Sequence, residues 1–584
     1  MKVCIAEKPS VALEIARVLG ARTRKDGYFE GNGYQVTWTF GHLCELQSPD
    51  AYSEKWAKWT LSTLPIIPKN FSIQLIKYKG IKKQFTVIKK LFSKAEEIIN
   101  CGDAGQEGEL IQHWVQQLAG IHCLVKRLWI SSLTEDSIRT GFTHLLPQSH
   151  YDSLYMAGLA RAEGDWLMGM NLTRLYTLKY APKDHLYSIG RVQTPTLAMI
   201  AARDKEIKNF VPKPYWTITT KYKGIEFTPT KGKFDTKTEA ERVLASLKNR
   251  NIRINKIKTT DKHEQPPQLY DLTSLQVDLN NKYGYSASES LSLIQSLYEK
   301  KVSTYPRVDT RYLTDDIYPK CRQILQSLKP YKDITEHLIT KPLGKSKRIF
   351  DGSKVTDHHA IIPTGKTATL TDKESKVFDL IARRFIAVFM PDSITEVMEI
   401  EASCAGITLK ATSSHTKQQG WKQAYPVKTD ESQTENHPDI IPGEEGLHTL
   451  VMRQKKTTPP KPYTEATLLR AMETAGRTIE DETIREAMKD NGIGRPSSRA
   501  SIIETLIKRG YISRKGKALA ATTEGSRLIS LIKYPLLKSP ETTGVWERHL
   551  REIEKGQFTK DLFIKGLESQ IRKIITEETT CKHL

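Results

Sequence analysis

The first part of the chain alternates short apolar runs with helical patterns. Residues 3–6 (Val-Cys-Ile-Ala) form an apolar run, and residues 11–19 then place apolar side chains at helical spacing. A second apolar run at residues 95–99 leads into the loop 103–108, after which a helix opens near Glu109. This repeated order of strand, turn and helix predicts an α/β fold with a parallel sheet.

Two acidic side chains follow these predicted strands. Glu7 comes directly after the first apolar run, and Asp103 follows the second. Because the carboxyl ends of parallel strands meet at one edge of a sheet, functional groups gather there. We therefore expect Glu7 and Asp103 to be neighbours.

The next pattern is helical. Residues 152–173 carry apolar side chains at helical spacing, and the loop 188–195 precedes another helix that runs to about Ile207. Thr194 is the expected N-cap of that helix, with Pro195 as its first residue.

A change to β structure follows. Residues 215–257 alternate Thr, Ile and Tyr with lysine-rich turns, which predicts strands with one helix near residues 238–247. The prolines at 266–267 mark a boundary, and residues 272–300 and 373–389 are helical again. Because 584 residues exceed one hydrophobic core, we expect several domains.

Charge narrows the class of partner. The chain carries 89 Lys and Arg against 67 Asp and Glu, a formal net charge of +22. A protein with a large excess of basic residues most often binds a nucleic-acid backbone, whose counterions are released as lysine and arginine replace them. A merely soluble basic surface is the other interpretation. DNA or RNA is the expected partner before any motif is considered.

Cysteine usage and hydropathy indicate the compartment. The seven cysteines are scattered singly, without any Cys-x-x-Cys pair. Structural zinc and a disulfide framework are therefore not expected, which fits a reducing cytoplasm. The apolar run at the N-terminus is too short for a signal peptide, and no stretch reaches the length of a membrane helix. We expect a cytoplasmic protein without a membrane partner.

The loop 103–108 combines Asp103 and Glu107 with two glycines. Clustered carboxylates repel one another unless a divalent cation or a retained proton relieves the repulsion. With Glu7 nearby, the functional interpretation is a Mg²⁺ site that works on phosphate oxygens. The ordinary alternative is an acidic turn at a helix N-terminus, where the helix dipole favours Asp and Glu.

The segment 303–310 places Tyr305 two residues from Arg307. Tyrosine is a poor nucleophile at neutral pH because its ordinary pKa is about 10. A guanidinium beside it can favour the phenolate and hold the phosphate that is attacked. A packed strand tyrosine beside an exposed arginine is the structural alternative.

Two further segments carry phosphate-binding chemistry. His358 and His359 are adjacent, so on an extended segment they point to opposite faces and at most one serves a common site. In the segment 491–499, a turn with two arginines leads into a helix whose N-terminal N–H groups would suit a phosphate. The structural alternatives are a satisfied histidine and capping by Ser497 or Ser498. No complete Walker A loop is present, so no ATP site is expected.

These segments together resemble the type IA DNA topoisomerase family, and within it the bacterial topoisomerase III branch, along almost the whole chain. The matching motifs come in the order of the family. They are residues 7–10, 40–43, 103–107, 127–132, 161–174, 188–195, 265–269, 304–309, 356–363 and 491–497.

The resemblance implies a multidomain fold of α/β, helical and β-rich parts. An N-terminal Toprim domain with a Rossmann-like sheet, helical domains and a β-rich hinge arch would close a toroidal ring around a DNA-sized hole. The expected divisions are residues 1–150 for the Toprim domain, 151–214 with 465–584 for a helical DNA-binding domain, 215–268 with 405–464 for the arch, and 269–404 for a helical domain that carries the nucleophilic tyrosine.

The resemblance also implies roles for single residues. Tyr305 would be the nucleophile, Arg307 would position it against the phosphate, Glu7 would be the catalytic acid and Lys8 would act beside it. The metal-associated carboxylates would be Glu7, Asp103 and Glu107, for Mg²⁺ without ATP or zinc. The expected DNA contacts are His42, Trp59, Arg161, Arg174, Ser188, Ile189, Gly190, Arg191, Val192, Gln193, Arg307, His359 and Arg495.

Two residues depart from the family loop Asp-x-Asp-Arg-Glu. Gly105 stands at the second Asp, which argues against a tightly bound second metal ion. Gln106 stands at the Arg, which would weaken phosphate binding.

The implied activity is ATP-independent cleavage of one DNA strand through a 5′-phosphotyrosine, passage of another strand, and religation. Single-stranded and underwound duplex DNA are the expected substrates, a helicase or single-strand-binding protein is a further expected partner, and a nucleoid-associated monomer is expected. A relaxase-type tyrosine nickase is the rival enzyme, although it would need a His-x-His metal cluster. A single-strand-binding module or a primase would leave Tyr305 without a role.

Overall fold

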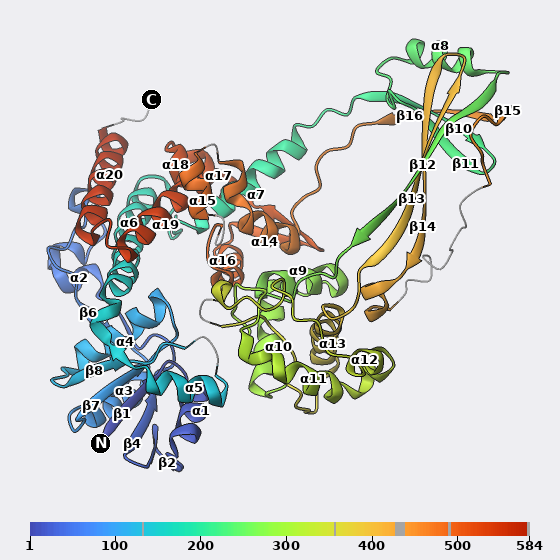
Figure 1. Cartoon of the computed structure of the whole chain (residues 1–584). Helices are drawn as coiled ribbons and strands as arrows, with labels where there is room; N and C mark the ends of the chain where they lie inside the picture. Colours follow the sequence, from blue (N-terminus) through green and yellow to red (C-terminus); the bar gives the residue numbers. More distant parts are fainter. Residues whose placement is uncertain (131–132, 356–357, 427–438, 480, 489–491, 581–584) are drawn as a thin grey trace.

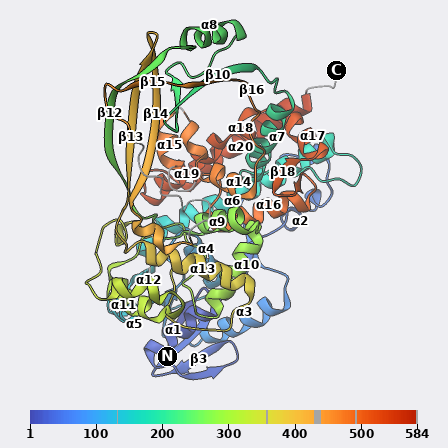
Figure 2. The ribbon, with the colours of Figure 1, turned by 90° about the vertical axis from the view of Figure 1, so that its right-hand side faces the viewer.

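The computed structural model describes residues 1–130, 133–355, 358–426, 439–479, 481–488 and 492–580. Figures 1 and 2 show four parts that follow one another around the ring that was predicted. The N-terminal domain contacts a helical part that carries Tyr305, while a long β-rich arch returns the chain to a second helical part. None of the described helices is long and apolar enough to cross a membrane.

The N-terminal domain is a seven-stranded sheet in the order β2-β3-β4-β1-β7-β8-β9. Alternate residues of the central strand face opposite layers: Val3 and Ile5 pack with α3 and α4, and Cys4 and Ala6 pack with α1 and α5. The predicted parallel sheet is confirmed for four strands. The elements that carry the site are β1 (Lys2–Ala6), α1 (Pro9–Leu19), β4 (Tyr34–Trp38), α3 (Lys79–Phe92), β7 (Glu97–Cys101), α4 (Gln106–Ala119), β8 (Leu124–Arg127), α5 (Glu135–Thr143) and β9 (Leu146–Pro147).

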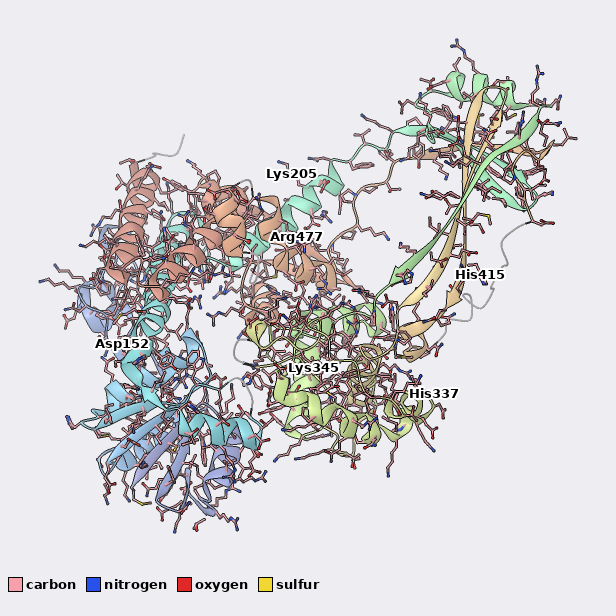
Figure 3. All side chains as sticks on the ribbon, in the orientation of Figure 1. Asp152, Lys205, His337, Lys345, His415 and Arg477 are labelled. Carbon is pink, nitrogen blue, oxygen red and sulfur yellow. The ribbon has the colours of Figure 1, made fainter. Side chains whose placement is uncertain are left out.

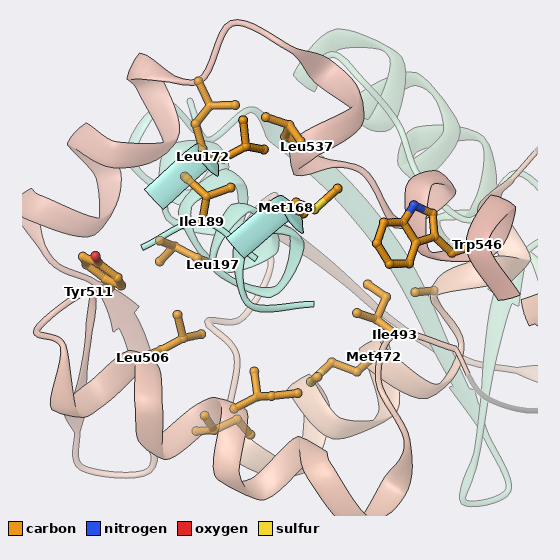
Figure 4. Packing of buried hydrophobic residues seen from close by; sticks show 14 of the residues in the cluster. Met168, Leu172, Ile189, Leu197, Met472, Ile493, Leu506, Tyr511, Leu537 and Trp546 are labelled. Atoms are coloured by element: carbon orange, nitrogen blue, oxygen red, sulfur yellow. The ribbon is translucent and has the colours of Figure 1, made fainter. Parts of the chain in front are cut away.

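The helical domain is built from two distant segments that share one hydrophobic core. Met168 and Leu197 from the first segment pack with Met472, Leu506 and Trp546 from the second (Figure 4). Its main elements are α6 (Asp152–Tyr180), α7 (Gln193–Lys208), α14 (Glu465–Glu473), α16 (Pro496–Lys508), α17 (Thr523–Leu531), α19 (Pro540–Glu554) and α20 (Lys560–Thr580).

One predicted helix start in this domain is wrong, and the capping alternative considered for a second helix is not observed. Val192, not Thr194, is the N-cap of α7, and the Thr194 hydroxyl instead accepts a hydrogen bond from the Gly190 N–H (3.0 Å). Arg495 is the N-cap of α16, and the Ser498 hydroxyl donates to the Arg495 carbonyl (2.9 Å). In both cases the hydroxyl binds the loop backbone rather than a helix N–H group.

The arch is an antiparallel sheet in the order β15-β12-β13-β14-β11-β10-β16, covered by α8 (Lys237–Leu247). Figure 3 places His415 on its long strands and His337 and Lys345 in the helical part that carries Tyr305. Its strands are β10 (Pro214–Tyr222), β11 (Ile225–Pro229), β12 (Asn251–Glu264), β13 (Ser393–Cys404), β14 (Ile407–Gln418), β15 (Glu445–Leu447) and β16 (Thr449–Lys456).

The predicted boundary between residues 404 and 405 is wrong. It assigns β13 to the helical part, whereas β13 pairs with β12 and β14 along its whole length and contributes Ile400 and Ala402 to the core of the arch. The arch therefore resumes at Ser393.

The tyrosine domain, residues 269–392, is helical. The predicted helix over residues 272–300 is interrupted, because Gly284 ends one helix in the left-handed conformation (φ 74°) and Ser286 caps the next. The main helices are α9 (Leu272–Tyr283), α10 (Ala287–Glu299), α11 (Tyr318–Ser327), α12 (Lys332–Ile339) and α13 (Asp372–Ala387).

Candidate active site

Tyr305 lies in an irregular segment that follows α10. Backbone hydrogen bonds from Thr304 N–H to the Ile362 carbonyl (3.0 Å) and from Ile362 N–H to the Thr304 hydroxyl (2.9 Å) join this segment to residues 358–363. The sequence motifs around Tyr305 and His358 are therefore side by side, although they are more than fifty residues apart.

Three side chains surround the phenol ring of Tyr305. The Tyr298 ring meets it edge-on at 5.4 Å, the His358 ring lies 4.4 Å away, and the Lys8 Nζ lies 4.5 Å from its centroid. Lys8 belongs to the N-terminal domain, so the tyrosine sits at the junction of two domains.

Glu7 and Asp103 are neighbours at the carboxyl edge of the sheet, as predicted. Lys8 Nζ joins them, at 3.2 Å from Glu7 Oε1 and 2.5 Å from Asp103 Oδ2. His358 Nε2 lies 3.6 Å from the same Asp103 oxygen. Carboxylates at the ends of two strands are thus joined to the Tyr305 ring through one ammonium group.

The environment sets these protonation states. Burial, with the nearby Asp103 charge, raises the pKa of Glu7, which favours a retained proton. Burial alone would also raise the pKa of Asp103, but Lys8 and His358 outweigh it and lower that pKa well below its usual value. The two carboxyl groups are therefore suited to different tasks.

The phenol of Tyr305 is protonated at neutral pH, because burial raises its pKa. The charges of Lys8 and, less strongly, Arg307 oppose that rise. Arg307 itself is exposed to solvent, where an incoming phosphate can reach it.

Glu107 does not join Glu7 and Asp103 in this arrangement. Its Oε1 lies 2.5 Å from His42 Nε2. Burial opposes the change, but the bond to His42 and the charges of Arg495 and Arg161 lower the pKa of Glu107 to about 2. Within the described ranges, no group of three or more metal-ligating side chains converges.

A cavity of about 430 Å³ opens beside Glu107, between α6, α19 and the start of α16. Every residue of the predicted segment 188–193 contributes to the wall of this cavity, and so do Arg161 and Arg495. Burial and the neighbouring Arg495 lower the pKa of Arg161 to about 10. Three guanidinium groups around one cavity suit an anionic ligand.

Acidic partners hold these arginines in place. The two oxygens of Glu547 bind Arg161 (3.0 Å) and Arg191 (3.1 Å), and Asp165 binds Arg191 from the other side (3.1 Å). Arg191 also stacks over Trp546 at 5.0 Å.

Gln106, the departure from the family loop, connects two domains. Its Oε1 accepts a hydrogen bond from Arg495 (3.0 Å) and its Nε2 donates to Glu554. A guanidinium from the helical domain is therefore bound to the position where the family loop has its own arginine.

The remaining predicted DNA contacts lie apart from Tyr305. Trp59 is 41% exposed and lies against the Arg174 guanidinium at 4.9 Å, while Arg174 also binds the Trp56 carbonyl. His359 Nδ1 is 2.9 Å from the Ala360 carbonyl, and His358, not His359, contacts Tyr305 and Asp103.

Comparisons with known proteins agree with this geometry. A model of the DNA topoisomerase family matches residues 149–565, and a model of the Toprim domain matches residues 2–133. The chain belongs to the type IA DNA topoisomerases. This membership confirms the topoisomerase interpretation, which is an isomerase activity, and the relaxase alternative has no support.

Relatives of this type IA topoisomerase are similar over nearly its whole length. DNA topoisomerase 3 of Shouchella clausii is 39% identical over 99% of this chain and 81% of its own length, and that of Bacillus subtilis is 37% identical over 98% and 81%. Full-length topoisomerase I from Thermotoga maritima has the same fold, with a TM-score of 0.74 and 23% identity over 100% of this chain and 91% of that one.

Sequence reasoning missed several residues of this topoisomerase site. Glu547 lies outside every motif, and Asp165 lies inside one without a role, because what they do depends on the arginines that they bind. The buried Arg127 was included in a motif without a role, and only its strand-end position gave a signal.

Proposed function

We propose that Tyr305 is the nucleophile of this type IA topoisomerase and that Glu7, Lys8 and Asp103 are its catalytic partners. The observation that carries the proposal is the single contact chain from the Tyr305 ring through Lys8 to both carboxylates. Among the described residues, Tyr305 is the tyrosine whose ring lies against Lys8.

The reaction then follows from the protonation states. Tyr305 Oη attacks the scissile phosphorus and loses its proton to water, a loss that the Lys8 and Arg307 charges favour. The bond from phosphorus to the 3′ oxygen breaks, and Glu7, whose pKa is raised, donates its proton to that oxygen. A 5′-phosphotyrosine and a free 3′-OH result, and the reverse attack by the 3′-OH religates the strand without ATP.

Glu7 and Asp103 are the residues that would hold Mg²⁺, with phosphate oxygens and water completing its shell. The fit is supported by the cation that already bridges them, the Lys8 ammonium. Glu107 would join only after leaving His42. When bound, Mg²⁺ would neutralise charge on the phosphate oxygens.

Single-stranded DNA would run along the cavity beside Glu107, with its phosphates on Arg161, Arg191 and Arg495 and a base on Trp59. Arg495, bound to Gln106, would supply the guanidinium that the loop itself lacks. The other proposed contacts are His42, Arg174, Ser188 to Gln193, Arg307, and His358 in place of His359.

For strand passage, the ring would open between the N-terminal domain and the tyrosine domain, with the arch as hinge. The proposed domains have the bounds expected from the sequence, except that the arch resumes at residue 393 and the tyrosine domain ends at residue 392. The same proposal includes underwound duplex DNA as a substrate and a helicase or single-strand-binding protein as a partner. It also includes a monomeric state and a cytoplasmic, nucleoid-associated location.

Label transfer tests the nucleophile. A single-stranded oligonucleotide labelled on the 3′ side of its cleavage site is incubated with protein and Mg²⁺ and quenched with denaturant. Wild type should carry label into the protein band, and Tyr305→Phe should carry none. Tyr298→Phe is the matched control, because that ring touches Tyr305, and it should retain labelling. Label on Tyr305→Phe would reject the assignment.

A further inference from the structure

Arg127 is a fully buried arginine directly beneath the Asp103 loop. It is the last residue of β8, which lies parallel to β7, the strand that ends at Cys101 before the loop. Its exposed fraction is 0%. A guanidinium in this position is desolvated and therefore needs partners for all its N–H groups.

Most partners of Arg127 are backbone carbonyls: that of Asn100 in β7 (Nη1, 3.3 Å), those of Gly102 and Asp103 at the loop, and that of its own neighbour Leu128. Nη2 donates to the Asp103 carbonyl (2.9 Å), and Nη1 donates to the Gly102 carbonyl (2.7 Å) and the Leu128 carbonyl (2.6 Å). Nε donates to Glu109 Oε1 at 2.5 Å, and Glu109 is equally buried in the first turn of α4. One planar side chain thus joins the end of β7, the loop and the helix that follows it.

Gly108 holds the loop from the other side. A Cβ at this position would lie 2.0 Å from the Asp103 carbonyl oxygen, so only glycine permits the approach. The Asp103 backbone is therefore fixed between Gly108 and Arg127.

Aromatic side chains cover the guanidinium. The Trp129 ring lies 5.1 Å from Arg127 Cζ and stacks on Tyr151 at 4.6 Å with an interplanar angle of 11°. Because this cover removes Arg127 from solvent, its charge is not presented to DNA.

We propose that Arg127 is a positioning residue for the topoisomerase reaction: it clamps the loop backbone so that the Asp103 carboxylate faces Lys8 and a bound Mg²⁺. Two of the five hydrogen bonds end on Asp103 and its neighbour Gly102, and a third ends on Glu109 in the helix that follows the loop, so most of the partners belong to the loop and the residues that flank it. The inference rests on the proposed role of Asp103.

Arg127→Lys and Glu109→Gln test the clamp. Lysine keeps the charge but cannot reach Glu109 and the loop carbonyls together. Arg139→Lys, on the exposed Arg139–Glu135 pair of α5, is the matched control. Three quantities are measured in each full-length variant: amide hydrogen exchange of peptides covering residues 102–108, binding of a single-stranded oligonucleotide in EDTA, and the Mg²⁺ concentration for half-maximal relaxation.

In Arg127→Lys, exchange in the loop should be at least tenfold faster and the half-maximal Mg²⁺ concentration at least tenfold higher, with DNA binding in EDTA within twofold of wild type. Glu109→Gln should shift both in the same direction by less, and Arg139→Lys should shift neither. If Arg127→Lys does not fold, Glu109→Gln decides.

Unchanged loop exchange would overturn the clamp, and so would equally faster exchange across the whole sheet, because Arg127 would then be an ordinary core residue. Wild-type relaxation without any divalent cation would instead remove the metal assignment. Loop exchange would still decide the role of Arg127 in that case.

Discussion

Lys8 links the chemistry of the two domains at the residue scale. Its ammonium lies between two carboxylates and also against the ring of Tyr305. Without nucleic acid, this single cation offsets the repulsion that sequence reasoning assigned to a metal ion. If Glu7 and Asp103 held a divalent cation instead, the Lys8 ammonium would be available to bind the phosphate and to favour the phenolate of Tyr305.

His358 gives a residue-scale prediction. Its ring packs on Tyr305 and its Nε2 faces Asp103. Without the imidazole, we expect the Tyr305 phenol to leave the orientation from which it would attack the phosphate. His358→Ala should lower the rate of covalent adduct formation at least tenfold. His359→Ala is the matched control and should change this rate less than threefold. Equal losses in both variants would contradict the geometric assignment.

The sequence correctly allowed only one of these histidines at the site, because adjacent residues of an extended segment face opposite ways. It could not say which one. Which histidine faces Tyr305 depends on the β-bridge between Ser303 and Pro363, two residues that lie sixty positions apart in the sequence. Tyr305, Glu7 and Asp103 were easier to predict, since each carries its chemistry within a local motif.

At the scale of elements, Glu547 holds α19 to the arginine-lined cavity through Arg161 and Arg191. Burial alone would raise the pKa of this carboxyl, but Arg161, Arg191 and Arg495 outweigh burial and lower it to about 2. A lowered pKa means that the carboxylate stabilises the fold above its unfolded pKa of 4.5 and loses this contribution as pH falls toward 2.

Glu547→Gln therefore tests the α19 contact. Between pH 4.5 and 2 the free energy of unfolding of wild type should fall by about 3 kcal/mol more than that of Glu547→Gln. Denaturant titrations at several pH values measure this difference. The same variant should bind single-stranded DNA more tightly at neutral pH, because two guanidiniums lose their internal counter-charge. Identical pH profiles would show that Glu547 does not stabilise the cavity.

Local patterns predicted most elements but not their grouping. The first strand and the first helix of the Toprim domain follow from a short apolar run and from apolar residues at helical spacing. The join of residues 151–214 to 465–584 came from family resemblance alone, because the contacts between Met168 and Trp546 leave no local signature. The error at β13 has a similar cause. A strand that runs from a helical domain into a distant sheet shows the same alternation of side chains whichever domain it belongs to, so the sequence does not reveal its partner strands.

At the scale of the whole molecule, the junction between the N-terminal domain and the tyrosine domain combines the partly buried contacts of Lys8 and His358 with more exposed ones. Ser10 and Tyr298 hydroxyls are 3.2 Å apart, and Lys301 pairs with Glu14 at 3.4 Å. Thr134 donates to Asp316 (2.9 Å) at the edge of the same junction. Exposed contacts such as the Lys301–Glu14 pair contribute little stability, which suits the proposed opening between these two domains.

A reducible crosslink tests this gate. Glu14→Cys with Lys301→Cys, in a background without Cys123 and Cys581, is bridged by a short dithiol-reactive linker. The crosslinked protein should still form the covalent adduct with a single-stranded oligonucleotide, yet lose at least nine-tenths of its relaxation activity. Reduction should restore relaxation. Full relaxation by completely crosslinked protein would place the opening elsewhere.

The overall charge predicted a nucleic-acid partner before any motif did, but it could not place the DNA. The proposed position of the DNA rests on the place where arginines of the helical domain meet the carboxyl edge of the Toprim sheet.

The most direct test of the central claim is mass spectrometry of the trapped adduct. After cleavage in Mg²⁺, denaturation, and digestion with nuclease and protease, the account predicts a nucleotide attached through its 5′ phosphate to the peptide that contains Tyr305. The same modification on any other peptide, or attachment through a 3′ phosphate, would contradict it.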